Sequence, residues 1–456
     1  MLSPAAHRVP SAATLNNAEG TPIMSWLTLR SGLVTAAATL ALAFASLTLG
    51  GCGSKSNQAT PAGGGGTETS AENAAPAGDA AAPAEGTGAG AAATPAGQAE
   101  TGPIRIGHYA SMTGKEATFG QSTDQGIRLA FKEINAAGGL NGRPIEIITY
   151  DTKGESKEAG NAVTRLITSD KVTAVLGEVA SSLSLAGGAV AQQYGVPMIT
   201  PSSTAPLVTR NRPMVFRVCF IDPFQGYVVA KFSREHLNAA TAAVLYDQAQ
   251  AYSKGLGDEF KRHFTQMGGK IVADQAYSSG DQDFSAQLTT IRSAKPDIIF
   301  VPGYYTEVGN IALQARRLGI TVPLLGGDGW DSEQLPAIAG SAIEGCYYAN
   351  HYAPDQPSDE VREFVEKYRA EYGGQTPDGL AALGDDAALV LFDAMKRAQS
   401  LSGPDLAKAI AETKDFRAVT GVITIDKNRD ASKSAVVVQM RDGKPVYVAT
   451  IEPPKE

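Results

Sequence analysis

The chain has 456 residues, a mildly acidic balance with a formal net charge of -8 at pH 7, and only three cysteines. The basic residues form no stripe or cluster, which argues against a nucleic-acid partner. The length left after the N-terminal region, about 350 residues, is typical of two domains.

The N-terminal region has the layout of a secretory signal peptide. A basic residue, Arg30, precedes an apolar run of small residues at 33–49, and Gly50, Gly51 and Cys52 close the run. A leucine three positions before the cysteine, with glycines between, resembles the bacterial lipobox, in which the cysteine becomes the lipid-carrying first residue. A retained membrane span is the alternative, but the run is short of the roughly 20 residues that a span needs.

We therefore predict a signal peptide at residues 1–51, with Met24 as its start, and lipidation of Cys52. Residues 53–102 consist almost entirely of small and polar types and include no large apolar residue. Such a segment buries too little surface to offset its chain entropy. We expect residues 52–102 to form a lipidated, flexible tether between a bacterial membrane and an exported domain that faces the periplasm or the cell exterior.

From residue 104 the chain alternates short apolar strands with amphipathic helices. The pattern predicts strands at 104–110, 144–151, 172–178 and 196–201, and helices at 125–139, 157–170 and 181–195. The same alternation returns after an extended apolar segment at 213–222. It predicts strands at 242–247, 270–277, 297–303 and 323–329, and helices at 254–269, 283–295 and 308–319.

A second extended segment, 343–353, closes this half. Helical patterns follow from residues 358, 379 and 403, and short strands are expected at 421–426, 435–440 and 446–450. Regular alternation of strand and helix predicts parallel sheets covered by helices on both faces. We expect an α/β protein of two lobes joined by several crossings, with residues 103–220 and 347–420 in lobe 1 and residues 221–346 and 421–456 in lobe 2.

Signatures of catalysis are scarce. The five histidines show no metal-ligand spacing with cysteines or carboxylates. The sequence has no phosphate-binding glycine loop with lysine, no G-x-S-x-G motif and no paired-carboxylate motif. We therefore expect no enzyme activity, no catalytic residue, no metal and no cofactor.

The loops after predicted strands are more informative, since ligands of open parallel sheets bind at the carboxyl ends of strands. Ser181 begins one helix, and Ser202 and Thr204 precede another helical turn, where free N–H groups favour an anion. Taken singly, each residue is also explained by ordinary helix capping. On neighbouring strands of one sheet they suggest a carboxylate site.

Asp328 follows a strand of the second half, between glycines and before Trp330. It could serve only to form a turn. A carboxylate that faces the serine and threonine groups across a cleft would instead bind an ammonium group, and an anion site beside a cation site fits an amino acid zwitterion.

Two segments carry a specific resemblance. "GHYASMTGKEATFGQSTDQGIRLAFKEINAAGGLNGRPIEIITYDTKG" and "GVPMITPSSTAP" resemble the bacterial leucine/isoleucine/valine-type periplasmic binding proteins of the type I fold, and the likeness runs from residue 104 to the C-terminus. It implies that Ser181 and the Thr204 N–H hold a ligand carboxylate. The Thr204 hydroxyl, the Ser202 carbonyl and Asp328 would hold the ammonium group.

The same resemblance places aromatic residues around the ligand. Tyr252 and Tyr304 stand where the family has aromatic residues that close the site from the second lobe, and Phe119 stands where a tyrosine often lines the side-chain pocket. The two tyrosines are equally compatible with plain core positions. Ala381 replaces a bulky aromatic of the closest relatives, which predicts an enlarged pocket.

The resemblance implies a monomeric solute-binding protein that closes on an amino acid, branched-chain or a similar small zwitterion, and delivers it to the permease and ATPase subunits of an ABC importer. An amide, urea or aromatic acid on the same fold is an alternative ligand, and a sensory ligand-presenting subunit is an alternative role. In this fold the crossings run side by side, so Cys219 and Cys346 could form a disulfide; two buried free thiols are the other possibility.

Overall fold

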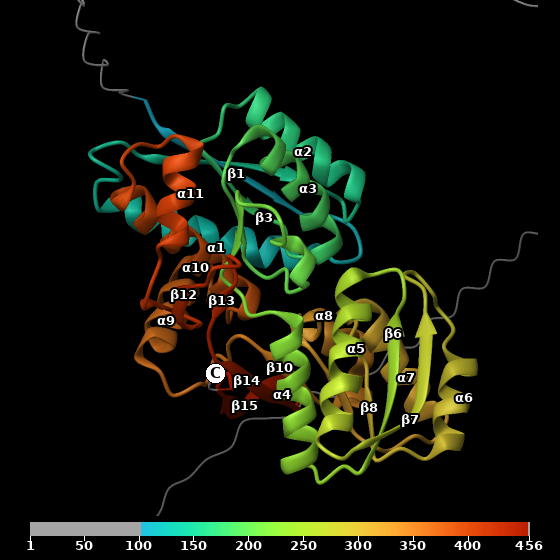
Figure 1. Cartoon of the computed structure of the whole chain (residues 1–456). Coiled ribbons are helices and arrows are strands. Elements are labelled where there is room, and N and C mark those ends of the chain that lie inside the picture. Colours follow the sequence, from blue (N-terminus) through green and yellow to red (C-terminus); the bar gives the residue numbers. More distant parts are fainter. Residues whose placement is uncertain (1–101, 455–456) are drawn as a thin grey trace, which may run out of the picture. The chain divides into compact units, whose positions relative to one another are not determined.

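The computed structural model describes residues 102–454 (Figure 1). The predicted signal peptide, Cys52 and the tether up to residue 101 lie outside the described residues and stay predictions. No helix within the described range is both long enough and apolar enough to span a membrane.

The first lobe is built on a five-stranded parallel sheet of order β2-β1-β3-β4-β5. Its strands are short, and the central ones are almost fully buried on both faces, as expected for a sheet covered by helices. They span Ile104–Ala110 (β1), Ile145–Asp151 (β2), Ala174–Gly177 (β3), Met198–Thr200 (β4) and Val215–Arg217 (β5).

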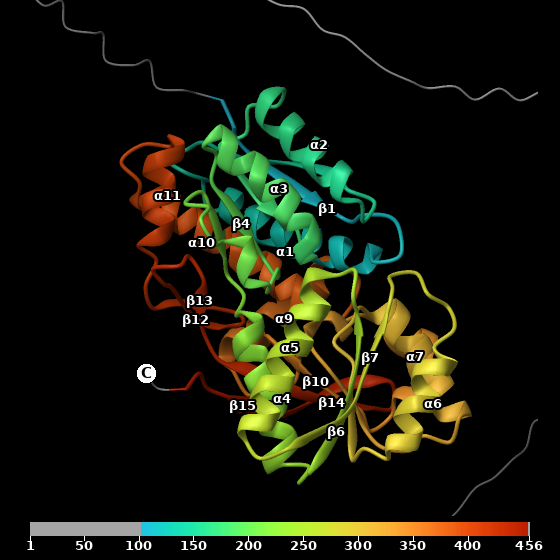
Figure 2. The same cartoon turned by 45° about the vertical axis from the view of Figure 1, so that its right-hand side comes forward.

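Helices cover both faces of this sheet (Figures 1 and 2). The helices α2 and α3 pack together on one face, and α1 packs with the later helix α10 on the other. Their bounds, with those of the neighbouring α9, α11 and a 3₁₀ turn η1, are Ala117–Ala136 (α1), Ser156–Thr168 (α2), Ser181–Tyr194 (α3), Pro206–Val208 (η1), Asp359–Glu371 (α9), Gly379–Arg397 (α10) and Gly403–Ala411 (α11).

The second lobe is built on a seven-stranded sheet of order β15-β14-β10-β9-β8-β6-β7. The five strands from β6 to β10 are parallel, and the C-terminal hairpin of β14 and β15 is added antiparallel to β10. The strands span Thr241–Asp247 (β6), Lys270–Tyr277 (β7), Ile298–Phe300 (β8), Leu324–Gly326 (β9), Tyr347–Asn350 (β10), Ala435–Arg441 (β14) and Lys444–Ile451 (β15).

Helices α4 and α5 pack together against this sheet, and α7 packs with α6 and α8 on the other side (Figure 2). Strands β6 to β9 each lead into a helix or 3₁₀ turn of this lobe, so the loops after them gather at the carboxyl edge of the sheet. The helices and 3₁₀ turns span Asp222–Glu235 (α4), Ala251–Gln266 (α5), Ser285–Ala294 (α6), Tyr305–Arg317 (α7), Asp328–Trp330 (η2), Gln334–Ala339 (α8) and Gly340–Ile343 (η3).

The chain passes between the two sheets three times: after β5, after β10 and before β14. A small three-stranded antiparallel sheet precedes the last passage and consists of Phe416–Ala418 (β11), Gly421–Ile425 (β12) and Ala431–Ser432 (β13). The sequence-based boundary at residue 347 is therefore wrong by one strand, because β10 pairs with β9 and β14 in the second lobe. Residues 421–432 likewise lie outside the second-lobe sheet.

Candidate functional site

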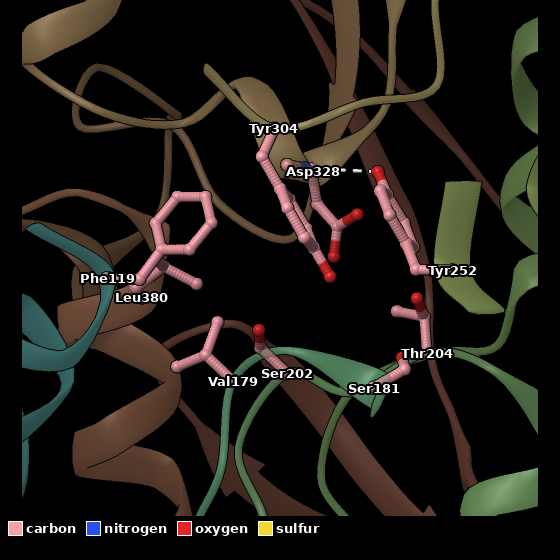
Figure 3. A pocket seen from close by; sticks show the side chains of 10 residues that line it. Phe119, Val179, Ser181, Ser202, Thr204, Tyr252, Tyr304, Asp328 and Leu380 are labelled. Atoms are coloured by element: carbon pink, nitrogen blue, oxygen red, sulfur yellow. Dashed lines mark hydrogen bonds between the residues drawn. The ribbon is translucent and has the colours of Figure 1, made fainter. Parts of the chain in front are cut away.

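A small cavity, with about 240 Å³ of empty space when the solvent at its mouth is counted, lies where the carboxyl edges of the two sheets meet (Figure 3). All seven side chains expected around a ligand line it: Phe119, Ser181, Ser202, Thr204, Tyr252, Tyr304 and Asp328. None of the seven is more than 7% exposed, so the lobes are closed over the cavity. The structure thus brings the predicted set together; that the set binds a ligand stays a prediction.

The first lobe contributes a polar wall from two neighbouring strands. Ser181 is the first residue of α3, just after β3, and Ser202 and Thr204 lie in the loop after β4. The Ser181 hydroxyl accepts a hydrogen bond from the Ala205 N–H at 3.2 Å, which joins the two loops. This wall combines hydroxyl groups with the start of α3, and a helix N-terminus favours an anion, so the arrangement suits a carboxylate.

The second lobe places Asp328 opposite this wall (Figure 3). Its two carboxylate oxygens accept hydrogen bonds from neutral groups: Oδ1 from the Gln225 amide at 2.9 Å and Oδ2 from the His351 ring at 3.1 Å. Burial lowers the pKa of His351 to about 4, against the opposing effect of Asp328, so this imidazole is uncharged at neutral pH. Both partners orient Asp328 without cancelling its charge, which leaves the carboxylate able to bind a cation in the cavity.

A second buried carboxyl group lies near this point. Asp222, the first residue of α4, is fully buried, and neither carboxyl oxygen has a hydrogen-bond partner of good geometry. Its backbone N–H donates to the Thr204 carbonyl at 3.0 Å. Burial raises the pKa of Asp222 to about 8; the Thr204 hydroxyl opposes this rise, and the charge of Asp328 adds to it.

Three aromatic side chains close the cavity. The rings of Tyr252 and Tyr304 stack with centroids 5.4 Å apart and planes 2° from parallel. Phe119 of the first lobe meets Tyr304 edge-on at 5.5 Å, so an aromatic contact crosses between the lobes. The Tyr252 hydroxyl accepts a hydrogen bond from the Gly329 N–H at 3.1 Å, beside Asp328. These rings therefore both wall the cavity and fix the loop that carries Asp328.

The end of the cavity away from Thr204 and Tyr252 is apolar. Phe119, Val179 and Leu380 form this end (Figure 3). The pocket residue of α10 is Leu380 and not the predicted Ala381, a correction of one position. Ala381 is fully buried against α1, where a Cβ on Gly126 would come within 1.9 Å of the Ala381 carbonyl. Leu380 narrows the cavity instead of leaving it enlarged.

Cys219 and Cys346 do not form a disulfide in this structure: both are buried free thiols, which is the second of the two possibilities that the sequence left open. The Cys219 thiol follows β5 and donates to the Ser203 carbonyl at 3.3 Å. Cys346 precedes β10 and lies 3.4 Å from the Arg316 guanidinium in the second lobe. Cys219 thus follows the carboxyl end of its strand, whereas Cys346 lies at the opposite, amino end of β10.

Sequence reasoning missed Val179, Leu380, Gln225 and His351. The first two are apolar residues next to a predicted helix start, and no pattern separates them from core residues. Gln225 and His351 do not line the cavity but bind the Asp328 carboxylate. Gln225 lies in α4, after the first crossing, and His351 follows β10, where the second crossing begins. Among residues 102–454 no cluster of His, Cys, Asp or Glu could hold a metal ion.

The fold and the cavity are those of a two-lobed binding protein. Comparison with known proteins identifies its family. The family described as periplasmic binding protein matches residues 103–445. The chain belongs to this family.

Relatives of known name agree with this assignment. A Leu/Ile/Val-binding protein homolog of Brucella abortus is 31% identical over 350 residues, which cover 75% of this chain and 93% of the relative. The leucine-, isoleucine-, valine-, threonine- and alanine-binding protein of Pseudomonas aeruginosa is 31% identical over 329 residues, which cover 72% and 87%.

Solved structures show the same fold. The leucine-binding protein LivK of Thermotoga maritima is 43% identical, with a TM-score of 0.74 over 77% of this chain and 99% of that one. The LivJ protein of Streptococcus pneumoniae, in complex with isoleucine, is 35% identical with a TM-score of 0.73 over 77% and 100%. A Rhodopseudomonas palustris protein in complex with 3,4-dihydroxybenzoic acid is 26% identical with a TM-score of 0.70 over 77% and 98%.

Proposed function

We propose that this chain is an extracytoplasmic solute-binding protein that captures an amino acid with an aliphatic side chain and delivers it to an ABC importer. One observation carries the proposal. Asp328 keeps an uncompensated negative charge on one side of a closed cavity, opposite a wall of hydroxyl and N–H donors. A zwitterion satisfies both sides, since its ammonium group binds Asp328 and its carboxylate binds the opposite wall.

Each lining residue then has a role. Ser181 and the Thr204 N–H hold the carboxylate, while the Thr204 hydroxyl, the Ser202 carbonyl and Asp328 hold the ammonium group. Tyr252 and Tyr304 close over the ligand from the second lobe. The ligand's side chain lies against Phe119, Val179 and Leu380.

Size and charge narrow the ligand class. Even with the open solvent at its mouth counted, the cavity holds only about 240 Å³ of empty space, so the ligand must be small. An apolar end of this kind suits a branched aliphatic side chain, as the names of the Brucella and Pseudomonas relatives also suggest. An aromatic acid, the ligand of one structural neighbour, would bring a carboxylate but no cation for Asp328.

Delivery follows from closure of the lobes. The ligand shifts an open–closed equilibrium only through its better fit to the closed form. Here the closed form unites the first-lobe wall with Asp328 and the tyrosines, so the ligand stabilises it by bridging the two lobes. The membrane permease would recognise this closed form and its partner ATPase would drive uptake, which makes the chain a binding component and not an enzyme.

Isothermal titration of the purified full-length protein tests the proposal. The panel contains leucine, isoleucine, valine, alanine, phenylalanine, 4-methylpentanoate, which lacks the ammonium group, and 3,4-dihydroxybenzoate. Removing one partner of a buried charge pair costs roughly 2–5 kcal/mol, so Asp328→Asn should weaken leucine binding by about thirtyfold or more. Binding of 4-methylpentanoate should not weaken. Wild-type protein that prefers 3,4-dihydroxybenzoate to every amino acid would contradict the proposal.

The proposal includes a lipid anchor at Cys52, which would hold the protein at the membrane through the tether at residues 53–102. Its support is the apolar run before the cysteine and the small residues around it. Metabolic labelling with palmitate should mark the wild-type protein and not Cys52→Ala, which should accumulate unprocessed or leave the membrane. Unlabelled wild-type protein that retains residues 33–49 would rule the anchor out.

A further inference from the structure

A buried arginine lies behind the first-lobe wall of the cavity. Arg217 is the last residue of β5, and its side chain is fully buried. The register of β4 with β5 pairs Thr200 with Arg217, so the arginine stands beside the loop that follows β4. That loop carries Ser202 and Thr204, whereas Arg217 is not among the cavity-lining residues in the described part of the chain.

The guanidinium group binds the carbonyl on each side of Thr204. Its Nη1 donates to the Ser203 carbonyl, and its Nη2 donates to the Ala205 carbonyl at 3.0 Å. In a planar trans peptide the C=O and N–H groups point in opposite directions. Because the Ser203 carbonyl points at Arg217, the Thr204 N–H of the same peptide points away from the arginine.

The other side of the guanidinium group is tied to a distant segment. Arg217 forms an ion pair with Asp430, with Nε 2.7 Å from Oδ1. The arginine side chain of this pair is completely buried. Thr209 joins the two, since its hydroxyl accepts from Arg217 at 3.0 Å and donates to Asp430 at 2.8 Å. Asp430 immediately precedes β13 and the last passage of the chain into the second lobe.

We propose that Arg217, held by Asp430, is a positioning residue for ligand binding: it aims the Thr204 N–H at the ligand carboxylate and joins this donor to the segment that crosses between the lobes. The inference rests on the proposed function. A planar fork with several fixed donors is required, because the two terminal nitrogens bind two carbonyls and a hydroxyl at once while Nε is held beside Asp430 by an ion pair. A lysine keeps the positive charge but offers a single ammonium group without this geometry.

The test compares Arg217→Lys with a matched variant, Arg316→Lys. Arg316 binds carbonyls in the same manner, donating to Ala342, Ile320 and Val322 at 2.8–3.1 Å, but it belongs to the second lobe and lies outside the cavity wall. Leucine affinity is measured by titration of the full-length proteins, and the folded fraction of each unliganded variant by urea unfolding. Both variants should unfold at lower urea concentration.

Only Arg217→Lys should lose affinity, by at least about tenfold or 1.4 kcal/mol. A loss of stability alone does not change the dissociation constant while the protein stays folded, so this difference separates positioning from a structural role. Equal leucine affinity in wild type and Arg217→Lys, or an equal loss in both variants, would overturn this inference alone. Failure of the wild type to bind any panel amino acid would instead overturn the proposed function.

A milder variant covers the case in which Arg217→Lys does not fold. Thr209→Val keeps the side-chain shape and removes both the acceptor for Arg217 and the donor to Asp430. Affinity for leucine should fall by about threefold or more, because a lost buried hydrogen bond loosens the guanidinium group. Unchanged affinity in folded Thr209→Val would refute the role of the Arg217–Asp430 network.

Discussion

Lys115 of the first lobe forms an ion pair with Glu307 of the second lobe, with Nζ 3.0 Å from Oε1. The side chain of Glu307 is buried and that of Lys115 is 41% exposed. The Thr306 hydroxyl donates to the Lys115 carbonyl at 2.8 Å beside the pair. Neither residue lines the cavity, so this contact stabilises the closed arrangement without touching the ligand.

Breaking this pair should weaken ligand binding through the open–closed equilibrium. Lys115→Met, Glu307→Gln and the double variant form a double-mutant cycle. Because Lys115 is partly exposed, we expect a coupling of about 0.5–1 kcal/mol, a two- to fivefold loss of leucine affinity seen mainly as faster dissociation. Stopped-flow measurement of tyrosine fluorescence would give the rate of leucine dissociation for each variant.

A pair of similar length within the first lobe provides the control. Lys367 binds Glu133 at 2.9 Å between α9 and α1, and Lys367→Met should leave leucine dissociation unchanged. Equal dissociation rates in wild type and Lys115→Met would show that the cross-lobe pair does not stabilise closure.

Leu380 should set the upper size limit of the ligand's side chain. Leu380→Ala removes the part of the apolar end contributed by α10, so leucine loses contacts while a larger side chain gains room. A methylene-sized change in an apolar pocket is worth about 1–3 kcal/mol, and we expect the ratio of phenylalanine to leucine affinity to rise at least about tenfold. Leu383→Ala, at a buried position one turn further along α10, should lower stability and leave the ratio unchanged.

The sequence predicted the fold and most of the cavity because alternating strands and helices constrain where loops gather. Loops after parallel strands meet at one edge, so Ser181, Thr204 and Asp328 could be placed from order alone. The start of α1 could not be predicted in this way. The helix begins at Ala117, eight residues before the expected start at residue 125. Its first turns carry a glycine and several polar residues, of which Ser122 binds Asp378 before α10 and Asp124 binds His108 of β1, so the helical period of apolar residues is weak there.

The sequence-based predictions failed where the placement of a residue depends on a single position or on its packing partners in the fold. Leu380 and Ala381 differ by one position, and only the packing of Ala381 against Gly126 shows which of them faces the cavity. Strand β10 was assigned to the wrong lobe because an apolar segment does not reveal which sheet it joins. The environments of Cys219 and Cys346 follow from strand register, which sequence does not fix.

Both cysteines should titrate as free thiols. Denatured protein, unfolded without reductant, should give a full reaction of Cys219 and Cys346 with a thiol reagent, and Cys219→Ser should lose one equivalent. In the native protein both should react slowly, since burial raises the pKa of the Cys219 thiol to about 12 and also raises that of Cys346. Absence of these thiols after denaturation would mean that the two form a disulfide after all.

Asp222 should make the unliganded protein less stable as the pH rises. In the unfolded chain its carboxyl ionises near the ordinary value of 3.8, whereas burial holds the pKa in the folded protein at about 8. Between these values the folded state binds the extra proton, so the free energy of unfolding falls with increasing pH. Below pH 3.8 both states are protonated and the contribution vanishes.

Asp222→Asn removes the titration and keeps the side-chain shape. Relative to wild type, the variant should gain stability as the pH increases from 4 to 8, by at most about 1.4 kcal/mol for each pH unit. Urea unfolding at several pH values measures this. Asp297→Asn is the control of opposite sign, because the backbone N–H and the hydroxyl of Thr241 lower the pKa of Asp297. The Asp297 carboxylate therefore stabilises the folded state at neutral pH, and this stabilisation is lost in acid. A constant difference between Asp222→Asn and wild type from pH 4 to 8 would show that Asp222 ionises at its ordinary pKa in the folded protein.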